Sequence, residues 1–251
     1  MRRVLFHFHG RSIYSYPAML YLGIVLGIYA ELYAASTIAL NLQAILTATL
    51  VLIATALLGA RLLHVLPHWR HYRQYPGRIL KCADGGASMY GGLLLAFPAS
   101  VPVLALLGLP FATFWDLASF AMLVGMVITR AGCFLNGCCS GRPTTGWCGM
   151  NLTNYRGVRR RRIPVQILEA AWGTAVLAGA VLLWGRLPFP GSLFLYAVGA
   201  YGLGRVLLES LRDEQDRVGG VSLHKAISLG LIATALGAFA AGWLSMALGT
   251  A

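Results

Sequence analysis

Long apolar runs separated by polar connections dominate the chain. A helix needs about 20 apolar residues to cross roughly 30 Å of hydrocarbon, and seven stretches come near that length. The pattern therefore predicts an all-α, polytopic membrane protein with about seven transmembrane helices. These helices are expected near residues 17–36, 42–66, 89–109, 113–134, 165–185, 191–211 and 225–247.

The long polar connections fall at 67–88, 135–164 and 211–224. Because these connections follow the second, fourth and sixth of the seven crossings, all three are expected on one face, the side of the amino terminus. We expect residues 1–251 to form a single integral membrane domain. The two halves share neither broken-helix positions nor polar motifs, which argues against a transporter built from internal repeats.

The composition supports the membrane assignment. Apolar residues make up 58% of the chain and charged residues only 11%, whereas a soluble domain usually carries about 25% charged residues. This deficit of charge excludes an ordinary soluble domain and a disordered chain. The net charge of +12 could suggest a nucleic-acid partner. Because the basic residues lie between long apolar runs, we instead expect anionic lipid and no nucleic acid.

Some charged residues stand inside the predicted membrane spans. Arg130 lies near the end of the fourth run, and the sixth run carries Tyr201, Arg205, Glu209 and Arg212 at a spacing that places all four on one stripe of a helix. An unpaired charge at membrane depth costs roughly 2.5 to 3.5 kcal/mol on insertion scales. Either Glu209 neutralises the arginines and ties helices together, or a guanidinium binds an anionic ligand. We favour a phosphate clamp, because Arg offers a rigid fork of donors that matches phosphate oxygens.

Five cysteines are present, and their odd number excludes a fully paired disulfide set within one chain. Four of them fall within sixteen residues, but an adjacent pair without a CxxC motif is a weak zinc pattern. We therefore expect no metal site and no cofactor. Cys133 is expected to be a small buried apolar residue, and the later three to pair only in an oxidising compartment. The cysteines are Cys82, Cys133, Cys138, Cys139 and Cys148.

Taken together, these motifs resemble the prolipoprotein diacylglyceryl transferase family over residues 12–235. The most specific string is TRAGCFLNG at 129–137, and it is supported in the same order by SYPAMLYLG, GARLLHVL, DGGASMYGG, IPVQILE and YGLGRVLLESLR. Members of this family are integral membrane enzymes with seven transmembrane helices. They bind phosphatidylglycerol, transfer its diacylglyceryl group to the thiol of a lipobox cysteine and release glycerol 1-phosphate.

The resemblance implies roles for individual residues. Arg130 and Arg205 would hold the phosphate, and Tyr90 takes the place of the His often proposed as the general base. A phenol with a pKa near 10 is a poor base, but an acceptor thiol with a pKa near 8.5 is already partly ionised. The reaction is therefore expected to persist with a weaker base or a different acceptor. Together with the polar stripe, the resemblance gives as substrate-binding residues Tyr16, Arg61, Asn136, Gly137, Gly141, Gln166, Glu169, Tyr201 and Glu209.

Two functions remain open at this point. The first is a membrane transferase that moves a diacylglyceryl group from phosphatidylglycerol to a thiol, either a lipoprotein cysteine or a divergent acceptor. The second is a non-catalytic phospholipid-binding or transport membrane protein. This alternative is motivated by Tyr90 and Ile163, which stand where the family has histidines. The resemblance implies a multi-pass protein of the bacterial inner (cytoplasmic) membrane, with phosphatidylglycerol and a prolipoprotein or other thiol acceptor as partners.

Two arguments about topology conflict. The amino terminus and the three long connections hold fifteen Lys and Arg residues, whereas the opposite side holds Arg186 alone. The positive-inside rule would place the basic face in the cytoplasm, but the resemblance implies that this face lies outside the inner membrane. We follow the resemblance, because the run Arg159–Arg162 beside the expected site would gather anionic lipid at about 1 kcal/mol per residue.

Overall fold

The computed structural model describes residues 4–8, 11–65, 69–74, 77, 89–153, 158–213, 217–218 and 221–249. The chain divides into two compact units. Unit 1 comprises Met1–Ala34 with Trp115–Ala251, and unit 2 comprises Ala35–Phe114. Most of the predicted polar connection 67–88 lies outside the described residues, as does Cys82.

Seven long helices in the described residues cover the seven predicted apolar runs. They are α1 (Ser15–Ser36), α2 (Leu42–Val65), α4 (Met89–Leu106), α5 (Phe111–Asn136), α6 (Val165–Leu183), α7 (Ser192–Glu209) and α8 (Leu223–Ala247), and a short α3 (Trp69–Gln74) follows α2. Five of them, namely α1, α2, α5, α6 and α8, are long and apolar enough to cross a membrane. The helical membrane class is therefore confirmed, whereas seven crossings are not. The apolar part of α4, Gly91–Leu106, is shorter, and α7 has 18 residues that include Arg205 and Glu209.

Short antiparallel hairpins occur in the polar segments. They pair β1 (Val4–Phe8) with β2 (Arg11–Tyr14), β3 (Met150–Thr153) with β4 (Arg159–Arg162), and β5 (Arg217–Val218) with β6 (Val221–Ser222). In the second hairpin Met150 is opposite Arg162, so the run of four arginines forms one strand of a two-stranded sheet. The hairpins are additions to a helical protein, and they were not predicted.

Unit 2 is built on close packing of α2 against α4. A Cβ atom on Gly59 would lie 2.3 Å from the Gly91 carbonyl oxygen, and one on Gly91 would lie 2.4 Å from the Gly59 oxygen. Only glycine allows the two backbones to approach this closely. Close packing of this kind holds helices together in a membrane, because burial of apolar surface gives no driving force when the surrounding lipid is equally apolar.

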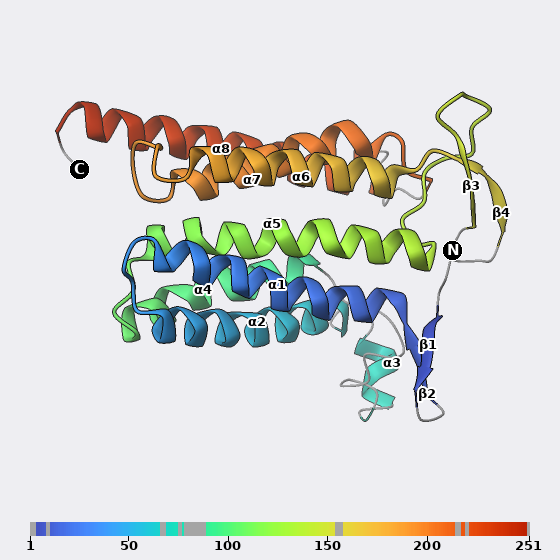
Figure 1. Cartoon of the computed structure of the whole chain (residues 1–251), viewed down its shortest axis with the longest axis horizontal. Coiled ribbons are helices and arrows are strands. Elements are labelled where there is room, and N and C mark those ends of the chain that lie inside the picture. Colours follow the sequence, from blue (N-terminus) through green and yellow to red (C-terminus); the bar gives the residue numbers. More distant parts are fainter. Residues whose placement is uncertain are drawn as a thin grey trace. The chain divides into compact units, whose positions relative to one another are not determined.

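Unit 1 holds α1 and α5 together through the same kind of contact. A Cβ atom on Gly27 would lie 2.7 Å from the Ala121 oxygen, and one on Gly132 would lie 2.8 Å from the Met19 Cβ. The carboxyl-terminal end of α5 therefore lies against the amino-terminal end of α1. Helices α6, α7 and α8 run side by side in the same unit (Figure 1).

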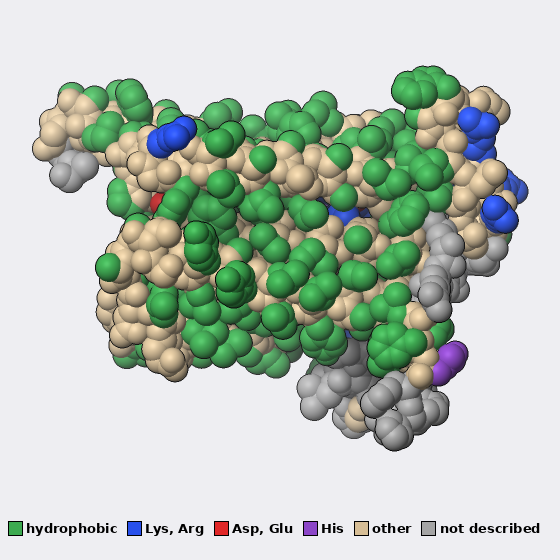
Figure 2. Space-filling view, in the orientation of Figure 1, with side chains coloured by type: hydrophobic (Ala, Val, Ile, Leu, Met, Phe, Trp, Pro, Cys, Tyr) green, Lys and Arg blue, Asp and Glu red, His purple; other side chains and the backbone are tan. Residues whose placement is uncertain are grey.

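The loops that follow α5 and α7 meet at one end of unit 1. Gly141 and Arg212 form an isolated antiparallel bridge, and the Arg142 amide donates to the Leu211 oxygen at 2.9 Å. Arg162 is buried and forms an ion pair with Asp213 at 2.5 Å. In Figure 2, Lys and Arg side chains gather over β3–β4, while the flanks of the helices are apolar. This arrangement brings the ends of α5, α6 and α7 together.

Asp116 fixes the start of α7 from α5. Its two carboxylate oxygens accept hydrogen bonds from the Gly191 amide at 2.6 Å and the Phe194 amide at 2.8 Å, and the side chain is buried. These amides belong to the cap residue and the first turn of α7, where backbone donors have no partner within the helix.

We expect Asp116→Asn to lower the free energy of unfolding by about 1 to 3 kcal/mol, because one buried amide then faces an NH₂ group instead of an acceptor. Thermal unfolding in detergent measures the effect. Thr174→Ala is the matched control, because the exposed Thr174 hydroxyl only donates to the Ala170 oxygen one turn back in its own helix. Equal unfolding temperatures for the two variants would contradict the role of Asp116.

Candidate active site

The buried carboxylate of Glu169 on α6 forms ion pairs with three arginines from three segments of unit 1. Glu169 Oε2 lies 3.1 Å from Arg130 Nη1, and Glu169 Oε1 lies 3.0 Å from Arg205 Nη1 and 3.3 Å from Arg212 Nη1. Glu169 is 6% exposed and the three arginines are between 8% and 17% exposed. Arg130 comes from α5, Arg205 from α7 and Arg212 from the loop after α7.

A second buried carboxylate completes the cluster. Glu209 Oε2 lies 2.9 Å from Arg205 Nη2 one turn away on α7, and Glu209 Oε1 accepts a hydrogen bond from the Ser222 hydroxyl at 3.3 Å. Three arginines and two glutamates leave this described cluster with one positive charge in excess. The cluster is therefore suited to an anionic ligand that carries a single negative charge.

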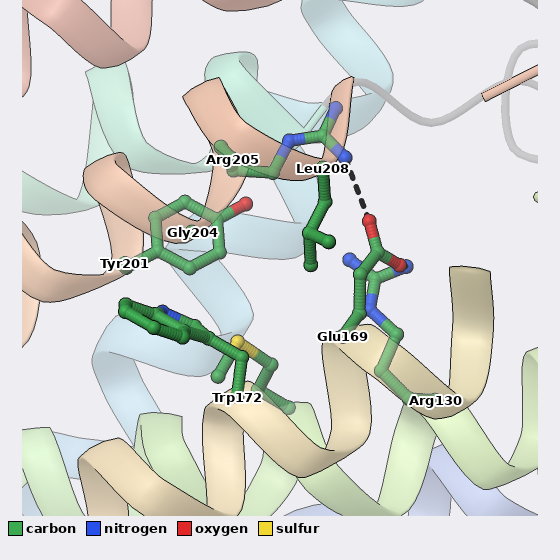
Figure 3. A pocket seen from close by; sticks show the side chains of 8 residues that line it. Arg130, Glu169, Trp172, Tyr201, Gly204, Arg205 and Leu208 are labelled. Carbon is green, nitrogen blue, oxygen red and sulfur yellow. Dashed lines mark hydrogen bonds and ion pairs between the residues drawn. The ribbon is translucent and has the colours of Figure 1, made fainter. Parts of the chain in front are cut away.

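A small pocket opens beside the cluster, with empty space of about 230 Å³, part of it open to the surroundings. In Figure 3 the Arg130 and Arg205 side chains both approach the Glu169 carboxylate, while Trp172 and Tyr201 lie further along α6 and α7. The indole of Trp172 donates to the Ala200 oxygen at 2.9 Å. The pocket is lined by Met126, Arg130, Glu169, Trp172, Tyr201, Gly204, Arg205 and Leu208.

The chain reverses sharply after α5. Gly137 has φ = 80° and its amide caps the helix by donating to the Cys133 oxygen at 2.9 Å, the usual left-handed helix ending. Cys139 also has a positive φ of 57°, which is uncommon for a residue other than glycine. The reversal places the sulfur atoms of Cys133, Cys138 and Cys139 within 4.8 Å of one another.

The environment of Cys139 favours its thiolate. Hydrogen bonds from the Cys133 and Cys138 thiols hold the pKa of Cys139 below its usual value, and the charges of Arg212 and Arg130 act in the same direction. The expectation that Cys133 is a buried small side chain is confirmed, since it is 4% exposed. Cys148, by contrast, is exposed.

Several predicted residues lie on the same reversal. Gln166 is fully buried in the first turn of α6, and its amide nitrogen donates to the Cys138 oxygen at 2.8 Å. Asn136 is the last residue of α5. A Cβ atom on Gly141 would lie 2.4 Å from the Ile163 oxygen, so this glycine lets the loops before and after the β3–β4 hairpin pack together.

The other predicted residues are distributed between the two units. Tyr16 is in the first turn of α1, where its Cα would lie 3.5 Å from a Cβ atom on Gly132. Arg61 belongs to unit 2, where it is buried and its guanidinium lies 5.4 Å from the centre of the Tyr72 ring. Tyr90 is the second residue of α4, and its side chain lies outside the described residues, as does that of His64.

One expectation about the polar stripe is wrong. Helix α7 ends at Glu209, so Arg212 does not project from the helix but returns to the cluster from the following loop. In the described residues its carboxylate partner is Glu169. The bridge to Gly141 fixes the loop in this position, because it pairs Arg212 with the segment after α5.

A profile described as prolipoprotein diacylglyceryl transferase matches residues 3–241. The chain belongs to this family.

Relatives of this chain are distant, and the matches to them cover between 76% and 93% of either protein. A phosphatidylglycerol–prolipoprotein diacylglyceryl transferase from Nostoc sp. is 27% identical over 248 residues, which cover 93% of this chain and 86% of the relative. Proteins with the same name from Bacillus mycoides and Dehalococcoides mccartyi are 25% and 27% identical; the matches cover 88% and 78% of this chain and 84% and 76% of those relatives. The chain is thus an enzyme of a membrane transferase family.

Sequence reasoning missed two residues of the candidate site. Trp172 is three residues after Glu169 on α6, a spacing that places both on one face of the helix, and this signal was available. Ser222 reaches Glu209 from the amino-terminal cap of α8. No spacing rule predicts that contact, because it depends on how α8 packs against α7.

We expect Gly204→Ala to reduce transferase activity strongly. The new Cβ atom would lie 2.3 Å from Trp172 Nε1, so the indole must leave its hydrogen bond to Ala200 and move into the pocket. Gly237→Ala on α8 is the matched control, because a Cβ atom there meets nothing within 4 Å. The control should keep full activity and gain about 0.5 to 1 kcal/mol of stability from the higher helix propensity of Ala. Equal activities of the two variants would show that the indole position does not matter.

Proposed function

We propose that this chain transfers the diacylglyceryl group of phosphatidylglycerol to a thiol acceptor, either the lipobox cysteine of a prolipoprotein or a divergent acceptor, and releases glycerol 1-phosphate. The observation that carries the proposal is the convergence of Arg130, Arg205 and Arg212 around Glu169, with one positive charge in excess. The phosphodiester of phosphatidylglycerol carries one negative charge, which matches this excess.

The arginines suit the departure of the phosphate. When a thiolate attacks the glyceryl carbon, the carbon–oxygen bond breaks and negative charge accumulates on the leaving phosphomonoester. Preorganised donors that face this developing charge lower the barrier. In our proposal Arg130 and Arg205 hold the phosphate, Glu169 orients both guanidinium groups, and Tyr201 borders the pocket that receives the lipid. The roles of Tyr90 and Arg61 remain predictions.

We further propose that α4 and α7 also cross the membrane. Together with the five apolar helices they give seven crossings, in one integral domain of the bacterial inner membrane. Helices of 18 residues are about 27 Å long, close to the hydrocarbon thickness of a bilayer. In α7 the two buried charges, Arg205 and Glu209, pair with each other, which removes most of the cost of placing them at membrane depth.

The second candidate function is a non-catalytic phospholipid-binding or transport protein. It is favoured by one observation, namely that Tyr90 and Ile163 stand where the resemblance implies histidines. Such a protein would keep the phosphate clamp and lack turnover.

Release of glycerol phosphate separates the two functions. Purified protein in detergent is incubated with phosphatidylglycerol and a peptide that contains a lipobox cysteine, and glycerol phosphate is measured over time. The transferase is expected to release it in proportion to the peptide present. Binding of phosphatidylglycerol without any release would support the non-catalytic alternative.

A further inference from the structure

Three thiols form a cluster beside the arginines. The proposed phosphate chemistry does not use these thiols. Cys133 lies in the last turn of α5, and Cys138 and Cys139 lie in the loop that follows. Their sulfur atoms are all within 4.8 Å of one another. Three tetrahedral zinc ligands with bonds of about 2.3 Å have sulfur atoms ~3.8 Å apart, so the thiols need to move together by no more than about 1 Å.

The surrounding groups hold the cluster in place. The Gln166 side chain donates to the Cys138 backbone oxygen at 2.8 Å, which ties the cysteine loop to the start of α6. The helix cap at Gly137 ties the same loop to Cys133. Outer contacts of this kind orient the ligands of metal sites.

The local charge also favours a metal–thiolate complex. A divalent cation with three thiolates carries one negative charge. Arg130 is three residues before Cys133 and thus lies on the same face of α5. The arginine–glutamate cluster beside it has one positive charge in excess. Before phosphatidylglycerol binds, the positive charge of the cluster offsets the negative charge of the complex.

We propose that Cys133, Cys138 and Cys139 hold one Zn²⁺ ion whose fourth position binds the thiol of the acceptor; this role rests on the proposed diacylglyceryl transfer. Zinc sites that act on substrates have three protein ligands and keep the fourth position for water or substrate. A thiol that coordinates the ion is deprotonated. The site would thus supply the nucleophile activation that a phenol at Tyr90 is poorly suited to provide.

The proposed step balances. The acceptor thiol releases its proton to water when it coordinates the zinc ion. Its sulfur then forms a bond to the glyceryl carbon of phosphatidylglycerol, and the bond from that carbon to the phosphate oxygen breaks. The electron pair leaves with glycerol phosphate, next to Arg130 and Arg205. Zinc stays divalent throughout, so no oxidant or reductant is needed.

Metal analysis of the purified full-length protein is the first test. We expect one zinc ion per chain, and loss of most of it in Cys133→Ser, Cys138→Ser and Cys139→Ser. Cys148→Ser is the matched control, because this cysteine is exposed and lies outside the cluster, and it should keep the metal. A protein that releases glycerol phosphate without bound metal, or a disulfide between two of the three cysteines, would overturn the proposal.

Cobalt in place of zinc tests binding of the acceptor without turnover and without any variant. The visible spectrum of the cobalt-loaded protein is expected to shift when a lipobox peptide with its cysteine is added, and to stay unchanged with the peptide in which Ser replaces that cysteine. An unchanged spectrum with the cysteine peptide would overturn the role in acceptor binding. If the spectrum shifts but the protein releases no glycerol phosphate from phosphatidylglycerol, the proposed transfer fails while the metal site stands.

Discussion

Replacing Arg130 or Arg205 by Lys is expected to remove most of the transferase activity, although each substitution keeps the positive charge. Both arginines are part of a buried network around Glu169. A point ammonium cannot reproduce the planar fork of donors that a guanidinium presents to a carboxylate and a phosphate at once. Loss of one such contact in the transition state should cost about 2 to 4 kcal/mol, which is a ~30- to 1,000-fold loss of rate.

Glycerol phosphate release by the purified variants measures this loss. Arg186→Lys is the matched control, because Arg186 is exposed in the connection between α6 and α7. Arg212→Lys should also lower the rate, since Arg212 contacts the same carboxylate. Near-normal turnover of the Arg130 or Arg205 variant, with the unfolding temperature and lipid content of the parent, would contradict the phosphate assignment.

The second large effect is expected for Glu169→Gln. The substitution leaves three poorly exposed guanidinium groups without their common counter-charge. Among the described residues, only Arg205 then retains a carboxylate partner, at Glu209. Removal of one partner from a buried ion pair typically destabilises a protein by about 3 to 5 kcal/mol. We therefore expect both a lower unfolding temperature and loss of activity.

Thermal unfolding with and without inorganic phosphate tests the electrostatic cause. An anion that replaces the missing carboxylate should stabilise the Glu169→Gln protein more than the parent. Glu209→Gln is the comparison variant, and it should have a smaller effect, because Glu209 pairs with Arg205 alone among the three arginines in the described structure. A Glu169→Gln protein that unfolds and reacts like the parent would show that the carboxylate does not organise the cluster.

The helices and the main arginines were predictable from the sequence. The length of the apolar runs predicted the seven long helices within a few residues, because a membrane segment must satisfy its own backbone hydrogen bonds. Family motifs pointed to Arg130, Arg205 and Glu169, which the structure brings together. The length of the apolar runs does not decide whether α4 and α7 cross the membrane.

The partners of the charged residues were not predictable. Helical spacing placed Arg212 on the stripe of α7, but the helix ends first and a bridge to Gly141 redirects the chain. The β3–β4 hairpin was also missed, because a strand of four arginines shows no alternation of apolar and polar residues.

The cysteine cluster shows the same limit. The spacing of Cys133, Cys138 and Cys139 resembles no common zinc motif, and it predicted no metal. What brings the sulfur atoms together is the left-handed backbone at Gly137 and Cys139. A glycine in the sequence indicates such a turn, but no sequence pattern predicts a positive φ at a cysteine.

The mass of a cysteine peptide after incubation with the protein tests the central claim most directly. Purified protein, phosphatidylglycerol and a lipobox peptide are combined, and the peptide is analysed by mass spectrometry. We expect the peptide to gain one diacylglyceryl group, in an amount equal to the glycerol phosphate released, and the peptide with Ser in place of its cysteine to remain unchanged. An unmodified cysteine peptide, with folded protein that binds phosphatidylglycerol, would contradict the assignment of diacylglyceryl transfer to a thiol.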